Sequence, residues 1–146
     1  MDQLEDSQNV GAIFRSALAF QLDGVILTHD NSVSENSFLT KAASSGVDKV
    51  PFTKIKSISS CIKILKENGY WIYGLEMKAG KSLKEMKFPN KVVIILGSES
   101  KGLRKITNSL CDEIIKIEIN NELESLNVSN TAAIAFYDIS NSILKS

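Results

Sequence analysis

The sequence predicts one α/β domain over residues 1–146, with a mostly parallel sheet and helices on both faces. Two observations support this prediction. Apolar residues at helical spacing alternate along the chain with short apolar runs of strand length. The run Lys91–Leu96 (KVVIIL) is almost continuously apolar, which is typical of a strand buried on both faces of a parallel sheet.

The first half of the chain begins with a helix and then alternates strands and helices. The first helix is indicated by an apolar face that repeats at helical spacing from Val10 to Leu18, and Asn9 is its expected N-cap. Gly46 and Gly69 are expected to end the next two helices. The elements expected after the first helix are a strand at Gly24–Thr28, a helix at Asn36–Ser44, a strand at Val50–Phe52, a helix at Ile58–Asn68 and a strand at Tyr70–Met77.

The second half continues the alternation. The polar stretch KSLKEMKF predicts a loop with a helical turn before the Lys91–Leu96 strand. A short helix at Leu103–Leu110, a strand at Glu113–Ile119 and a long helix at Leu126–Leu144 complete the expected order.

Composition excludes several classes of protein. The 17 Lys+Arg residues balance 17 Asp+Glu residues, so a uniformly basic nucleic-acid binder is excluded, although Lys78, Lys81, Lys84 and Lys87 leave a local basic stretch. No apolar run approaches the roughly 20 residues of a membrane span. Two isolated cysteines and one histidine predict no metal site and a reducing, cytoplasmic setting.

Three polar segments are candidates for a catalytic or binding site, and each also has an explanation that is purely structural. The segment Gly97–Gly102 (GSESKG) follows the buried strand, where ligands of parallel sheets bind, but it also fits a plain strand-to-helix turn. Its Glu99 would repel a pyrophosphate, which predicts a neutral or positively charged ligand rather than NAD. The segment Asn121–Asn130 carries more polar residues than the helix cap at Ser125 requires, although a capping motif alone would explain part of it.

The third segment, Asn9–Arg15, opens the first helix. Gly11 and Arg15 are four residues apart and share one side of that helix. Glycine in a first helical turn lowers helix propensity, which suggests close contact with another group. Arg15 suits a phosphate or a carboxylate, and a solvated arginine is the alternative.

Together the three segments resemble the motifs of the SpoU (TrmH-type) RNA 2′-O-ribose methyltransferases of the SPOUT superfamily. The resemblance covers almost the whole chain and preserves the order of the motifs. The matching residues are Asn9-x-Gly11-Ala12-Ile13-x-Arg15-Ser16-Ala17, then Ile95-Leu96-Gly97-Ser98-Glu99-x-x-Gly102-Leu103, then Ser125-Leu126-Asn127-Val128-Ser129.

The resemblance implies a SPOUT-type fold with a C-terminal deep trefoil knot and a homodimer with its active site at the interface. It also implies S-adenosylmethionine (AdoMet) as cofactor. By similarity, the cofactor-binding residues are Leu75, Leu96, Gly97, Gly102, Ile117, Leu126 and Asn127.

The implied reaction is methyl transfer to a ribose 2′-hydroxyl of structured RNA, a guanosine of 23S ribosomal RNA being the expected target. The residues that the resemblance assigns to catalysis are Asn9, Arg15, Glu99, Ser125 and Asn127. A guanidinium stays protonated in proteins, so Arg15 is expected to orient a phosphate or stabilise charge rather than act as a base. The alternatives are a tRNA ribose methyltransferase, a catalytically inactive SpoU-like RNA-binding module and an unrelated flavodoxin-like nucleotide binder.

The chain departs from the family pattern at its start and in its loops. Only Met1–Leu4 precedes motif one where the family has an apolar first strand, and the N-terminal RNA-binding domain of many members has no counterpart here. Ser7, Ser100, Glu118 and Asn121 stand where the family often has proline or glycine. None of these changes removes a side chain assigned to catalysis.

Overall fold

The computed structural model describes residue 1 and residues 6–28, 49–98 and 101–144. The expected helix at Asn36–Ser44 and the side chain of Glu99 lie outside the described residues. In chain order the elements are α1 (Ser7–Ala19), β1 (Val25–Thr28), β2 (Phe52–Ile55), α3 (Ile58–Glu67), β3 (Trp71–Leu75), β4 (Lys81–Ser82), the 3₁₀ turn η2 (Leu83–Glu85), β5 (Val92–Leu96), α4 (Lys105–Leu110), β6 (Glu113–Lys116) and α5 (Val128–Leu144).

The strands form two sheets in the part of the chain that the structure describes. One sheet pairs β1 with β2, and the other has the order β4-β6-β3-β5. All the strand pairings are parallel. The predicted α/β class with a mostly parallel sheet is therefore confirmed, whereas its division into two sheets was not anticipated.

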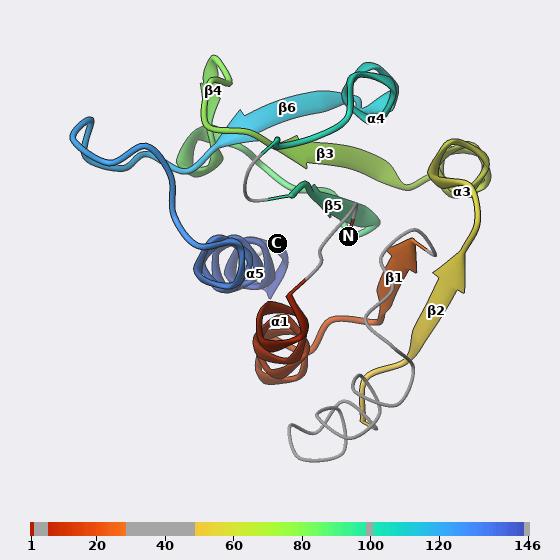
Figure 1. The fold of residues 1–146 in the computed structure, drawn as a ribbon. Helices are drawn as coiled ribbons and strands as arrows, with labels where there is room; N and C mark the ends of the chain where they lie inside the picture. The colour runs from red at the N-terminus through yellow and green to blue at the C-terminus, as the bar shows by residue number, and fades with distance from the viewer. Residues whose placement is uncertain (2–5, 29–48, 99–100, 145–146) are drawn as a thin grey trace.

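Helices cover both faces of the larger sheet (Figure 1). Side chains of β3 alternate between two buried clusters, because successive residues of a strand point to opposite faces. Tyr73 and Leu75 belong to the cluster that also contains α1 and α5. Ile72 lies in the second cluster with Ile62 of α3 and Leu103, just before α4. The predicted arrangement of helices on both faces is confirmed.

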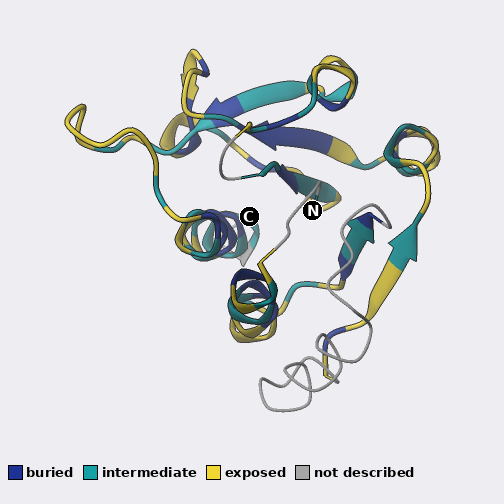
Figure 2. Cartoon of the chain, in the orientation of Figure 1, coloured by how far each residue is buried: buried dark blue, intermediate teal, exposed yellow. Residues whose placement is uncertain are grey.

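The main core lies between the α1–α5 pair and the sheet. Figure 2 shows the buried sides of these two helices turned toward each other and toward the strands. Ala17 of α1 and Ala132 and Ala135 of α5 are fully buried in the core that these helices share, and such small side chains let helix backbones approach closely. This contact holds together two segments that lie more than a hundred residues apart.

Two helix ends follow from single residues. Gly69 has φ +81°, a left-handed conformation that glycine adopts without strain, and it ends α3 as the sequence predicted. At the start of α1 the prediction was wrong, because the N-cap is Asp6 and not Asn9. The Asp6 carboxylate accepts a hydrogen bond from the Gln8 amide at 2.8 Å, so the helix begins one turn earlier.

Other boundaries shift for local reasons. Strand β2 begins after Pro51 rather than at Val50, because Pro51 has no N–H and only its carbonyl oxygen joins the ladder, 2.9 Å from the Val25 nitrogen. The expected helical turn in KSLKEMKF is confirmed as η2, preceded by the two-residue strand β4 that the sequence did not predict. Among the described residues, no helix is long and apolar enough to cross a membrane.

Candidate functional site

The segments after β3 and β5 meet at the carboxyl edge of the larger sheet, where parallel sheets bind ligands. The turn after β5 is closed by two hydrogen bonds between Ser98 and Gly102, of 3.1 and 2.9 Å. Gly102 has φ +65°. A Cβ on Gly97 would collide with the backbone of Gly102 and Leu103. Both motif glycines are therefore required by the turn itself.

Glu76, the first residue after β3, lies beside this turn and was not selected from the sequence. One of its carboxylate oxygens accepts a hydrogen bond from the Asn108 side-chain nitrogen at 3.0 Å. The other oxygen lies 3.6 Å from the position that a Cβ on Gly102 would take. The Glu76 amide donates to the Ile115 carbonyl oxygen at 3.0 Å, which anchors the residue to β6. The sheet edge thus carries a half-buried negative charge.

The first and third motifs are joined by a direct hydrogen bond. The Asn127 side-chain nitrogen donates to the Asn9 side-chain oxygen at 3.0 Å across 118 residues of sequence. Asn9 is only 8% exposed, on the face of α1 that meets α5. The side-chain oxygen of Asn127 accepts from the Ser129 amide at 2.9 Å and from the Ser129 hydroxyl. Asn127 therefore fixes the start of α5 and ties it to α1.

Ser125 does not cap the last helix, so the alternative that explained this segment by a cap at Ser125 is wrong. The helix begins at Val128, and Asn127 supplies the oxygen that the Ser129 amide needs. Ser125 is exposed in the segment before the helix, and Leu126 beside it is half-buried. An asparagine adjacent to the helix is simply better placed than a serine three residues before it.

Arg15 is exposed on α1, one turn beyond Gly11. Among the described residues, Arg15 makes no hydrogen bond or ion pair. Arg15 and Asn9 lie on different sides of α1, because six residues correspond to about 240° of helix rotation. One copy of the chain therefore does not bring the guanidinium to the Asn9–Asn127 pair.

The remaining cofactor candidates are distributed between the core and the sheet edge. Leu75 and Leu96 are buried, and the Leu96 side chain points into the interior rather than toward the Gly97 turn. Ile117 is half-buried against the main core, just beyond the end of β6. At the carboxyl edge of the larger sheet, a ligand would therefore meet the backbone groups, and not the side chains, of Leu75, Leu96 and Ile117.

Thiol chemistry is not supported. Burial raises the pKa of the Cys111 thiol to about 11, with Asp112 and Glu76 adding to the shift and Lys66 opposing it. The Cys111 thiol instead donates to the Thr107 carbonyl oxygen at 3.3 Å. Burial also raises the pKa of Cys61. Both thiols therefore remain protonated near neutral pH, and the described residues contain no cluster suited to a metal ion.

The fold is that of a parallel α/β protein, and its candidate site combines the glycine turn beside Glu76 at the sheet edge with the Asn127–Asn9 hydrogen bond between α5 and α1. The chain belongs to the SpoU rRNA methylase family, whose model matches residues 1–137. It is 36% identical over 138 residues to the 23S rRNA (guanosine-2′-O-)-methyltransferase RlmB of Xylella fastidiosa, covering 94% of this chain and 55% of that protein. It is 33% identical over 139 residues to a putative TrmH family tRNA/rRNA methyltransferase of Staphylococcus saprophyticus, covering 95% of this chain and 56% of that protein. The chain thus spans about half the length of these curated relatives.

Solved structures agree on the fold. The SpoU methyltransferase AviRb from Streptomyces viridochromogenes in complex with AdoMet superposes with a TM-score of 0.89 at 19% identity, over 99% of this chain and 59% of that one. A structure described as giving insight into the 2-OH methylation of C/U34 on tRNA superposes with a TM-score of 0.84 at 20% identity, over 99% of this chain and 93% of that one. The predicted SpoU-type α/β fold is therefore confirmed.

Proposed function

We propose that this chain is a SpoU-type catalytic domain that binds AdoMet and methylates a ribose 2′-hydroxyl of RNA. The observation that carries the proposal is the Asn127–Asn9 hydrogen bond, which joins two motifs of the family across 118 residues of sequence. The substrate proposed first is a guanosine of 23S ribosomal RNA, after the curated relative at 36% identity. We place the protein in the cytoplasm, where that RNA is found.

The sheet edge suits AdoMet chemically. AdoMet carries positive charge on its sulfonium and ammonium groups and two hydroxyls on its ribose. The Glu76 carboxylate lies next to the Gly97 and Gly102 turn, where it can attract the positive charge or accept from a hydroxyl. The turn leaves backbone groups close to the edge because neither glycine has a side chain. Ile117 and Leu126 complete the proposed pocket, and the knot that the family resemblance implies would bring Leu126 to it.

The reaction requires an RNA hydroxyl to be oriented toward a methyl group and to lose its proton. AdoMet supplies the electrophilic methyl group when it is bound. Arg15 is proposed to hold an RNA phosphate and to stabilise negative charge that develops on the ribose oxygen. Asn9 and Asn127 position the start of α5 through their hydrogen bond, while Ser125 and Glu99 are assigned polar contacts by the family motifs.

A homodimer would bring Arg15 to a second active site. The α1–α5 layer exposes Leu18, Ile134 and Tyr137 to 39%, 42% and 59%, and Arg15 lies on the same helix as Leu18. Large apolar side chains on one layer favour burial against another chain. We propose that two copies associate through this layer, so that the Arg15 of one copy contacts the site of the other.

The direct test is turnover on RNA. The purified chain is incubated with labelled AdoMet and an unmodified 23S ribosomal RNA fragment, with unmodified tRNA in parallel. Label on a guanosine ribose of the fragment supports the proposal. Label on tRNA alone would support the second candidate, a tRNA methyltransferase, which the relative from Staphylococcus saprophyticus favours. AdoMet binding without label on either RNA would identify an inactive RNA-binding module.

A further inference from the structure

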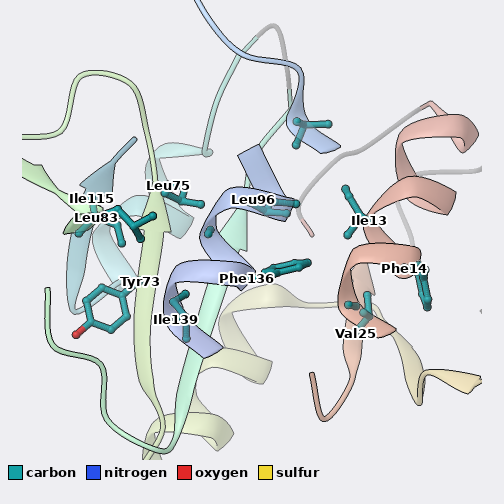
Figure 3. Close-up of a cluster of buried hydrophobic side chains, with 14 of the residues drawn as sticks. Ile13, Phe14, Val25, Tyr73, Leu75, Leu83, Leu96, Ile115, Phe136 and Ile139 are labelled. Atoms are coloured by element: carbon teal, nitrogen blue, oxygen red, sulfur yellow. The ribbon is translucent and has the colours of Figure 1, made fainter. Parts of the chain in front are cut away.

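Glu76 points toward α4 and away from the main core. Successive residues of a strand face opposite sides of a sheet, and Figure 3 shows the side chain of Leu75, the residue before Glu76, within the main core. Glu76 therefore lies on the side of the sheet that Ile72 and Leu103 share. The hydrogen bond of 3.0 Å from the Asn108 side-chain nitrogen to the Glu76 carboxylate agrees with this placement.

A glycine in β3 brings the α4 segment close enough for that bond. A Cβ on Gly74 would lie 2.5 Å from a methyl carbon of Leu103 and 2.7 Å from one of Ile114, so even alanine would displace these side chains. Leu103 begins the segment that leads into α4, and Gly74 lets this segment pack directly on the sheet. The Asn108 side chain on α4 can then reach the residue that follows the strand.

Asn108 holds one carboxylate oxygen of Glu76 and leaves the other available. Oε2 accepts the hydrogen bond, while Oε1 faces the glycine turn, 3.6 Å from the position that a Cβ on Gly102 would take. Oε1 has no hydrogen-bond donor within the part of the chain that the structure describes. It is also not among the buried polar atoms that lack a partner, so solvent or a ligand can reach it. Oε1 is therefore an accessible acceptor at the turn.

Glu76 differs from the nearby carboxylates because no cation accompanies it. Asp112 and Glu113, at the start of β6, lie 2.7 Å from the side-chain nitrogens of Lys66 and Lys81 respectively. Glu76 has only a neutral amide as its partner and forms no ion pair with any residue that the structure describes. Charge attraction is screened less at a half-buried carboxylate than in open water. This edge of the sheet therefore favours a positively charged ligand over a neutral one.

We propose that Asn108 is a positioning residue, and that the Glu76 carboxylate which it holds discriminates by charge between AdoMet and the product S-adenosylhomocysteine. This inference rests on the proposed function. The two molecules share their adenine, ribose and amino-acid groups. They differ at sulfur, which is a positively charged sulfonium in AdoMet and a neutral thioether in the product. Glu76 therefore strengthens the binding of AdoMet and not that of the product, which limits inhibition by the product.

Calorimetric titration with both ligands tests the role of Glu76. Glu76→Gln removes the charge and keeps an oxygen that can accept from Asn108. We expect the Kd of AdoMet to rise about tenfold and the Kd of S-adenosylhomocysteine to change by less than about twofold. Glu67→Gln is the charge-matched control, because Glu67 is exposed at the end of α3, which leads to the opposite edge of the sheet; it should change neither Kd.

A second pair of variants tests the positioning role of Asn108. Asn108→Ala removes the anchor and keeps the charge, so the Kd of AdoMet should rise about threefold while that of S-adenosylhomocysteine stays within about twofold. Ser109→Ala is the control on the same helix, because the exposed Ser109 hydroxyl donates only to the Ile106 carbonyl oxygen; it should change neither Kd. The double variant of Asn108→Ala and Glu76→Gln should bind both ligands as Glu76→Gln does, since Asn108 acts through Glu76.

The possible failures are distinguishable. Equal weakening of both ligands in Glu76→Gln would overturn discrimination by charge, because a group common to the two molecules would then be the one recognised. A further loss of AdoMet binding in the double variant would overturn the positioning role of Asn108. Either result, in a parent chain that binds AdoMet, leaves the proposed function standing. A folded parent chain that binds neither ligand would overturn the proposed function and this inference together.

Discussion

The hydrogen bond between Asn127 and Asn9 allows the assembly of the site to be tested by substitution. Asn127→Ala removes both functions of the side chain, the cap on the Ser129 amide and the donor to Asn9. Loss of a helix cap costs about 1 kcal/mol, and loss of a partly buried hydrogen bond costs about 1 kcal/mol more. The expected loss of about 2 kcal/mol in the free energy of unfolding lowers the Tm by about 4–8 °C for a chain of this size.

Asn127→Asp separates the two functions. The carboxylate retains an oxygen for the Ser129 amide but has no N–H to donate to Asn9. It should therefore lose only about 1 kcal/mol. Asn130→Ala is the matched control, because Asn130 is exposed on the first turn of the same helix; its effect should stay within about 0.5 kcal/mol.

Urea and thermal denaturation followed by circular dichroism measure these differences. A double-mutant cycle of Asn9→Ala, Asn127→Ala and the double variant measures the interaction energy between the two side chains. We expect a coupling energy of about 1 kcal/mol. A coupling near zero would refute the bond between the two helices. Equal stabilities for the Asn127→Ala and Asn130→Ala variants would also refute the assignment of Asn127 as the cap.

Four further outcomes are expected. Arg15→Ala should reduce methyl transfer to RNA by at least about 100-fold without changing the Tm, because the side chain is exposed; near-normal turnover would disprove its role. Gly97→Ala should abolish AdoMet binding and lower the Tm, since its Cβ collides with backbone, while Gly80→Ala, which has open space, should change neither. Glu76→Gln should weaken AdoMet binding about tenfold in calorimetry with the fold intact, and an unchanged Kd would exclude a contact with the cofactor. The pKa of Cys111 is about 11 in the folded chain against 9.0 for a free thiol, so the unfolded state releases this proton first. The free energy of unfolding should therefore fall between pH 9 and about 11, and Cys111→Ser should reduce that slope.

Patterns that repeat along the chain predicted the elements well. The apolar run Lys91–Leu96 and the face from Val10 to Leu18 became β5 and the buried side of α1. The start of α1 was missed because its first turn, Ser7 to Asn9, carries no apolar residue that periodicity could detect. Strand β4, Lys81–Ser82, is only two residues long, too short for any alternation to show.

Contacts between segments that are distant along the chain could be predicted from the sequence only in part. The resemblance placed Asn9 and Asn127 in one site, but the bond between them spans 118 residues and no local pattern predicts its geometry. The separation of β1 from β5 depends on which strands pair, and single strands do not carry that information. Glu76 lies outside the glycine-rich and polar segments that mark the candidate site in the sequence, but it directly follows β3, and ligands of parallel sheets bind just beyond strand ends.

The proposed function depends above all on a cofactor site at the carboxyl edge of the larger sheet. Calorimetric titration of the chain with AdoMet, with ATP and NAD as controls, tests it most directly. We expect saturable binding of one AdoMet per chain, no binding of ATP or NAD, and loss of the AdoMet signal in Gly97→Ala but not in Gly80→Ala. A folded chain that gives no AdoMet signal, or whose Gly97→Ala variant binds AdoMet as the parent does, would contradict the placement of the site.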